Sequence, residues 1–156
     1  MAAHKIKTLK ALLKKVRSVR REGKRVVFTN GCFDLLHVGH TRLLEKAKSL
    51  GDFLVVGLNS DRSVRQLKGP RRPVNPERAR AEILSALRSV DGVVIFSEKT
   101  PEKLIKAIQP DILVKGGDWK KKEVVGGKFV TSYGGKIYLF PTVKGYSTTK
   151  LLRRKR

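Results

Sequence analysis

Five short runs rich in Val, Ile, Leu and Phe recur along the chain, and each has the length and composition of a buried β-strand. Between them lie segments in which apolar residues recur with helical spacing. In one such segment Leu43, Leu44, Ala47 and Leu50 share one helix face, and Gly51 follows as a stop signal. The strand-like runs span residues 25–29, 53–58, 93–96, 112–114 and 136–140.

Three further segments predict amphipathic helices, one before the first strand and two between later strands. Pro76 suits a helix start, Thr100 and Pro101 open a turn, and Pro110 ends the last of these helices. The predicted apolar stripes consist of Leu9, Leu12, Leu13 and Val16; of Ala79, Ile83, Leu87 and Val90; and of Leu104, Ile105 and Ile108.

Strands that alternate with helices predict βαβ units, and right-handed crossovers then give an open sheet covered on both faces. The fold class that we expect is α/β: a single Rossmann-like, doubly wound domain with a mostly parallel five-stranded sheet. We expect this one domain to occupy residues 1–156, with residues 1–24 as a helical lead-in and residues 150–156 as a basic C-terminal tail.

Charge gives the chain a strong preference for anionic partners. It has 36 Lys and Arg against 13 Asp and Glu, a net charge of +23. Residues 1–25 hold ten basic and one acidic side chain, and residues 150–156 hold five basic and none acidic, so more than half of the excess lies at the two ends. Such a surface attracts nucleic acid, anionic membranes and small phosphorylated substrates alike. A general aid to solubility is an equally good explanation.

Composition also excludes several classes of protein. The longest apolar run, residues 53–58, is far shorter than the roughly 20 residues that a membrane-spanning helix needs. The basic start of the chain reaches no long apolar stretch, so we expect no secretory signal and no membrane insertion. Cys32 is the only cysteine, which excludes an internal disulfide and a Cys-rich zinc module. The expected location is the cytoplasm.

Ligands of an open α/β sheet bind beyond the carboxyl ends of its strands, where the strand order reverses. The loops after Thr29, Val114 and Phe140 are expected to meet there. In the first of them, His37 and His40 are three residues apart and project from about the same side of one helical turn. They could donate hydrogen bonds to a phosphate at a helix N-terminus. A helix cap with one packed histidine fits as well, whereas zinc fits less, since only His4 and Cys32 remain as further N or S ligands.

Glycines and short polar side chains favour an anion site in all three loops. Gly31 allows a tight turn, and Gly39 leaves room for a phosphate to approach the backbone. After the fourth strand, Lys115, Gly116, Gly117 and Asp118 could receive a flat base or form a simple turn; Ser147, Thr148 and Thr149 could bind phosphate or only cap a helix. Elsewhere, Lys68 and Arg72 belong to a basic loop, and Asp34 and Asp61 follow strands, where they could hold sugar hydroxyls or a metal or act as caps.

The segment from Asn30 to His40 resembles the HxGH signature of the nucleotidylyltransferase superfamily. Three further segments resemble the D-glycero-β-D-manno-heptose 1-phosphate adenylyltransferases within it, and the similarity runs from about Leu9 to the C-terminus. They are Leu67-Lys68-Gly69-Pro70-Arg71-Arg72-Pro73-Val74-Asn75-Pro76, Leu113-Val114-Lys115-Gly116-Gly117-Asp118-Trp119 and Gly145-Tyr146-Ser147-Thr148-Thr149. In many bacteria this activity is one half of a bifunctional protein with a sugar kinase; the chain resembles the half without the kinase, in stand-alone form.

The resemblance implies an enzyme that joins ATP and a heptose 1-phosphate into ADP-heptose and pyrophosphate, for glycans of the lipopolysaccharide type. It implies Mg²⁺ held mainly by the nucleotide phosphates, with no protein metal site, and a homodimer, for which the apolar face of the N-terminal helix would be a contact. The implied catalytic residues are His37, His40 and Lys68. The implied nucleotide-binding residues are Asn30, Gly31, Cys32, Phe33, Gly39, Lys115, Gly116, Gly117, Asp118, Ser147, Thr148 and Thr149, and the substrate-binding residues are Asp34, Asp61 and Arg72.

Two alternatives stay open. The glycerol-3-phosphate cytidylyltransferases share the HxGH and Ser-Thr-Thr segments, but their last motif usually has an Arg a few residues before its Gly, where this chain has Thr142 and Lys144. A basic nucleic-acid-binding protein fits the charge and the terminal arms. It fits the 6% aromatic content less well, since no alternation of basic and aromatic residues occurs. Incidental polyanion binding is compatible with the enzyme.

Overall fold

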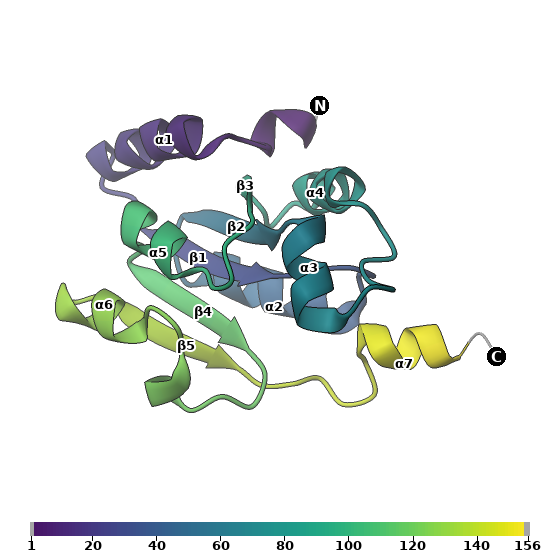
Figure 1. Ribbon diagram of the computed structural model, residues 1–156. Coiled ribbons are helices and arrows are strands. Elements are labelled where there is room, and N and C mark those ends of the chain that lie inside the picture. The colour runs from purple at the N-terminus through teal and green to yellow at the C-terminus, as the bar shows by residue number, and fades with distance from the viewer. Residues whose placement is uncertain (1, 155–156) are drawn as a thin grey trace.

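The computed structural model describes residues 2–154 and contains one sheet of five parallel strands in the order β3-β2-β1-β4-β5 (Figure 1). This confirms the predicted α/β class and the parallel sheet. The strands are β1 (Val26–Gly31), β2 (Phe53–Asn59), β3 (Gly92–Phe96), β4 (Ile112–Gly116) and β5 (Lys136–Phe140).

Three of the strands run further toward their carboxyl ends than the apolar runs predicted. The register continues through Asn30 and Gly31 of β1, which pair with β2, and through Lys115 and Gly116 of β4, which pair with β5. These residues were missed because ladder hydrogen bonds come from the backbone, whereas the prediction followed apolar side chains. The extension brings residues expected in loops onto rigid strand ends.

Helices cover both faces of the sheet (Figure 1). One core cluster joins the sheet to α1, α5 and α6, and the other joins it to α2 and α4. The helices are α1 (Leu9–Arg21), α2 (Val38–Ser49), α3 (Asp61–Lys68), α4 (Glu77–Ala86), α5 (Glu102–Ile108), α6 (Gly127–Ser132) and α7 (Thr148–Arg153), with single 3-10 turns η1 (Ala2–Lys5) and η2 (Lys121–Glu123). The predicted basic tail overlaps α7, and its last two positions, 155 and 156, lie outside the described residues.

The N-terminal lead-in packs against the sheet and contributes to its core. The side chain of Thr8 caps α1, and Leu12, Val16 and Val19 are buried against the first core cluster. Ile6 forms a parallel bridge to Val93 at the sheet edge. The apolar face of α1, which we expected to be available to a second copy of the chain, is therefore covered by the protein's own core.

Helix α4 has a different buried face from the one that we predicted. Arg80, Ala81, Leu84 and Ser85 are buried, whereas Ile83 is 43% exposed. The prediction assumed that apolar side chains mark the inner face. Here an arginine and a serine are buried, and the helix ends at Ala86, before the last two positions of the predicted stripe. Helix α3 was also missed, because it buries few apolar side chains; Ser60 caps it by accepting the Ser63 N–H.

Candidate active site

Two adjoining hollows, of about 470 and 590 Å³, open at the carboxyl ends of β1 and β4. The strand order reverses between these two strands, so this is the switch point at which the sequence predicted a ligand site. Residues shared by both hollows are Asn30, Gly31, Cys32, Phe33, His37, His40, Lys68, Lys115, Tyr146 and Ser147.

The two hollows differ in the side chains that each has to itself. The first hollow extends toward β5 and the loop that follows it, along Gly116, Gly117 and Phe140. The second hollow extends toward β2 and the loops after α3 and β3, along Asn59, Arg72 and Lys99. The first therefore has glycine backbone and apolar walls, and the second has cationic and polar walls.

His37 and His40 stack on each other at the start of α2, with ring centroids 3.8 Å apart. His37 is the N-cap, and its Nδ1 accepts the N–H of Gly39 at 3.1 Å. Nδ1 of His40 accepts the N–H of His37 at 3.4 Å. Because both Nδ1 atoms accept hydrogen bonds, both neutral rings carry their proton on Nε2. The sequence analysis gave a helix cap and a pair of phosphate donors as alternatives. In the structure the same two histidines provide both.

Burial keeps both imidazoles neutral. It lowers the pKa of His37, and it lowers the pKa of His40 to about 4, with the neighbouring His37 adding to the effect. At neutral pH the start of α2 therefore presents two N–H donors together with the positive end of its own dipole, and no imidazolium charge. This combination is suited to oxygen atoms on which negative charge grows.

Two glycines, one at the end of β1 and one at the start of α2, leave room for neighbouring aromatic rings. A Cβ on Gly39 would lie 2.9 Å from the His37 ring, and a Cβ on Gly31 would lie 3.0 Å from the ring of Phe33. Phe33 is buried with φ of 44°, and its ring centroid is 5.2 Å from that of His40. Gly39 leaves space for the His37 ring and also lines the first hollow, so the approach of a phosphate to its backbone stays a prediction.

The end of β4 forms the opposite wall. Lys115 lines both hollows, and its Nζ lies 5.1 Å from the centre of the Trp119 ring. Burial lowers the pKa of Lys115. A Cβ on Gly116 would lie 2.4 Å from Leu43 of α2, so this glycine allows β4 and α2 to pack closely. Gly117 lines the first hollow with φ of 105°, whereas Asp118 is exposed and lines neither hollow.

The chain returns to the site after β5. Ser147 lines both hollows, and Thr148 and Thr149 line the second. Ser147 caps α7 by accepting the N–H of Lys150, and the hydroxyl of Thr148 donates to the carbonyl of Leu35. This hydrogen bond ties the C-terminal helix to the loop after β1, and Figure 1 shows α7 beyond the carboxyl ends of the strands.

Asp34 is buried in the wall of the second hollow and holds the loop before α4. Its carboxylate accepts the N–H groups of Val74 and Asn75 and forms an ion pair with Arg72 Nε at 2.7 Å. Burial raises the pKa of Asp34, but these two backbone donors and the guanidinium outweigh it and lower the pKa overall. Asp34 therefore orients Arg72, which lines the second hollow.

Asp61 lies away from both hollows. Its carboxylate pairs with Arg80 Nη2 at 2.8 Å, and it lines a separate hollow of about 520 Å³. Arg80 is 1% exposed and was missed by the sequence analysis. The sequence did contain a signal for it: Arg80 lies next to alanines in the middle of a predicted helix, and a charged side chain that is buried there has to be paired.

Lys68, predicted on a loop, is the last residue of α3 and lines both hollows.

A metal site built from protein side chains does not fit this region. Across residues 2–154 no group of three or more His, Cys, Asp or Glu side chains is placed to hold an ion. The acidic group closest in sequence to the histidines, Asp34, is already engaged with Arg72.

Within residues 2–154 no helix is both long and apolar enough to cross a membrane.

Comparison with known proteins agrees with this geometry. A family model described as cytidylyltransferase-like matches residues 28–154. The chain belongs to the cytidylyltransferase-like family. Within this family it is 57% identical over 150 residues to the bifunctional protein HldE of Geotalea uraniireducens and 54% identical over 154 residues to that of Koribacter versatilis. These matches cover 96% and 99% of this chain but 31% and 32% of the relatives, so the chain spans about a third of their length.

Solved structures extend the comparison. The lipopolysaccharide core biosynthesis protein from Thermoplasma volcanium is 31% identical, with a TM-score of 0.64 over 80% of this cytidylyltransferase-like chain and all of that one. A pantoate-beta-alanine ligase from Francisella tularensis, solved with an ATP analogue (beta-gamma ATP) and beta-alanine, is 19% identical. Its TM-score is 0.56, and the match covers 85% of this chain and 66% of the ligase. This second likeness shows a shared fold.

Proposed function

We propose that this protein transfers the adenylyl group of ATP to D-glycero-β-D-manno-heptose 1-phosphate, releasing pyrophosphate and forming ADP-heptose. The observation that carries the proposal is the pair of neutral imidazole N–H donors at the start of α2, facing the crossover between β1 and β4. The motifs that resemble heptose 1-phosphate adenylyltransferases support this acceptor. So does the similarity to HldE and to a lipopolysaccharide core biosynthesis protein.

The two hollows suggest where each substrate binds. The first hollow, with glycine backbone at Gly116 and Gly117, suits the base and ribose of ATP. The second hollow, with Arg72 and Lys99, suits an acceptor that carries both phosphate and hydroxyl groups. His37, His40, Lys68 and Lys115 line both hollows, so the α-phosphorus of ATP would lie between them. Asp118 and Asp61 lie outside the walls of both hollows, so this proposal gives them no contact to either substrate.

The chemistry requires alignment and neutralisation of charge more than proton transfer. A phosphate oxygen of the acceptor attacks the α-phosphorus of ATP, an O–P bond forms, and the bond to the pyrophosphate oxygen breaks on the opposite side. The attacking oxygen is already an anion, so no general base is needed. The two Nε2–H groups and the lysines stabilise the oxygens of the transition state, where charge increases.

Mg²⁺ enters this proposal as part of the ATP substrate. The site is rich in cationic side chains, and the described residues offer no cluster of acidic ligands. We therefore propose that the ion is held by the nucleotide phosphates, and that it balances their charge.

A cytoplasmic location and a homodimer remain predictions. The buried face of α1 is not available as the dimer contact, so another surface would have to form it.

A pyrophosphate-release assay tests the proposal. ATP, CTP and GTP are each combined with Mg²⁺ and either D-glycero-β-D-manno-heptose 1-phosphate or glycerol 3-phosphate. We expect release with ATP and the heptose only. Release with CTP and glycerol 3-phosphate would keep the site and replace the substrates, and no release with any pair would refute the enzyme.

A further inference from the structure

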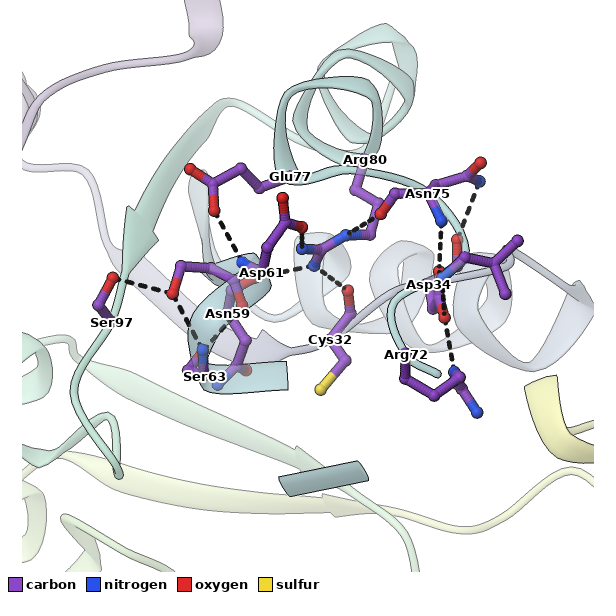
Figure 2. A network of polar contacts seen from close by, with 12 residues as sticks. Cys32, Asp34, Asn59, Asp61, Ser63, Arg72, Asn75, Glu77, Arg80 and Ser97 are labelled. Atoms are coloured by element: carbon purple, nitrogen blue, oxygen red, sulfur yellow. Dashed lines mark hydrogen bonds and ion pairs between the residues drawn. The ribbon is translucent and has the colours of Figure 1, made fainter. Parts of the chain in front are cut away.

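Arg80 is only 1% exposed, and each nitrogen of its guanidinium donates at least one hydrogen bond. Nη1 donates to the carbonyl of Cys32 at 2.7 Å and to that of Asn59 at 2.8 Å. Nε donates to the carbonyl of Asn75 at 2.9 Å, and Nη2 pairs with Asp61 at 2.8 Å. Figure 2 shows these four partners arranged around the guanidinium. A buried charge of this kind is retained only where its donors are satisfied.

The partners of Arg80 come from four separate segments that surround the second hollow. Cys32 follows β1, Asn59 ends β2, Asn75 precedes α4, and Asp61 begins α3. Cys32 and Asn59 line the second hollow, whereas Arg80 lines neither hollow. The guanidinium therefore lies behind the wall and fixes the relative positions of the segments that form it.

A second set of contacts connects Arg80 to the cationic side of the same hollow. The Asn75 backbone N–H donates to Asp34 at 3.0 Å, and its side-chain amide donates to the carbonyl of Asp34 at 3.2 Å. Asp34 in turn holds Arg72. Figure 2 shows Asn75 between the two groups, with its carbonyl toward Arg80 and its amides toward Asp34. Arg80 thus acts on Arg72 through Asn75 and Asp34.

We propose that Arg80 is a positioning residue that sets the shape of the second hollow, and thereby aligns the acceptor with the α-phosphorus of ATP. This inference rests on the proposed function. The planar guanidinium can donate to three carbonyls and one carboxylate in fixed directions, whereas an ammonium group cannot reach all four partners. Only one of the partners, Cys32, also lines the first hollow, so ATP binding depends less on Arg80 than acceptor binding does.

Arg80→Lys tests the proposal at a temperature well below its unfolding transition. We expect the KM for the heptose phosphate to rise about tenfold or more and kcat to fall by about tenfold, because small displacements of bound substrates slow the reaction. The KM for ATP should stay within about threefold of the wild-type value, because Cys32 is the one partner of Arg80 that lines the first hollow. Trp119, the only tryptophan, lines the second hollow, so its fluorescence gives the dissociation constant of the sugar phosphate without turnover.

The matched control is Arg78→Lys, on the same helix but exposed, which should keep the wild-type constants. A purely structural role predicts a lower Tm for Arg80→Lys with kcat and both KM values unchanged, and that result would overturn the proposal. An equal rise of both KM values would also overturn it. Arg80→Gln replaces a lysine variant that does not fold; if neither folds, Arg80 is a requirement of the fold and the proposal fails.

The outcome for Arg80 can be separated from the outcome for the proposed function. If the wild-type protein uses a different acceptor, the proposed function is wrong, and the same KM comparison with that acceptor still decides the role of Arg80. If the wild-type protein turns over no pair, the dissociation constant of ATP from calorimetry and that of the sugar phosphate from Trp119 fluorescence decide it.

Discussion

His40 uses its two ring nitrogens for two different tasks. Nδ1 accepts the N–H of His37 and belongs to the cap of α2. Nε2–H is the donor that we assign to the phosphate. His40→Asn separates the tasks, because the amide oxygen can take the place of Nδ1 while nothing replaces Nε2–H. We expect turnover to fall by about 10²-fold or more, with little change in Tm at pH 7.

The same variant reports on the buried state of His40 through the pH dependence of stability. The folded pKa is about 4 and the ordinary value is 6.5, so below pH 6.5 the unfolded chain binds the proton more readily. Stability due to this group is unaffected above pH 6.5 and is lost as the pH falls toward 4, on the order of 3 kcal/mol in total. Urea unfolding of wild type and variant between pH 4 and 8 measures the difference. Parallel curves would show that His40 has no lowered pKa.

At the scale of single elements, Gly39 at the start of α2 lowers helix propensity but leaves space for the His37 ring. Gly39→Ala should favour the helix by roughly 0.5–1 kcal/mol, since glycine is a poor helix former. The new Cβ would lie 2.9 Å from the His37 ring, which has to move. Because that ring is also the N-cap of α2, its displacement offsets the gain. We therefore expect little change in Tm with at least about tenfold lower kcat/KM. Ser49→Ala, at the exposed far end of α2, is the control. Unchanged turnover in Gly39→Ala would mean that the position of the His37 ring is not critical.

The elements also show what the sequence could and could not predict. Strands β1 to β4 were found because most of their residues on both faces are buried, as in β2, whose seven residues are all buried. The inner face of α4 was predicted wrongly because Arg80 occupies a core position, which hydrophobic periodicity does not reveal. The loops that form the hollows were predicted from topology. The roles of individual side chains depend on contacts distant in sequence, such as the 48-residue separation between Arg80 and Cys32.

For the whole molecule, the net charge of +23 is an excess of basic side chains that the 13 acidic ones are too few to pair. Asp34, Asp61 and Asp91 form ion pairs that hold loops and strand ends together, so these three of the 13 acidic side chains are engaged in the fold. The remaining field attracts polyphosphates toward the protein, which suits an enzyme whose two substrates are both anions. The same field will also attract nucleic acid without any dedicated interface.

A salt titration separates these two consequences of the charge. We expect a short DNA duplex to bind in about 50 mM salt without sequence preference, and to lose binding by about 200 mM, because contacts to phosphates alone depend steeply on salt. Pyrophosphate release with ATP should persist across that range, since the His37 and His40 donors act at short distance within the hollows. Fluorescence anisotropy of labelled duplexes measures the first and the release assay the second. Tight duplex binding at 200 mM, together with absent turnover, would favour the nucleic-acid-binding alternative over the enzyme.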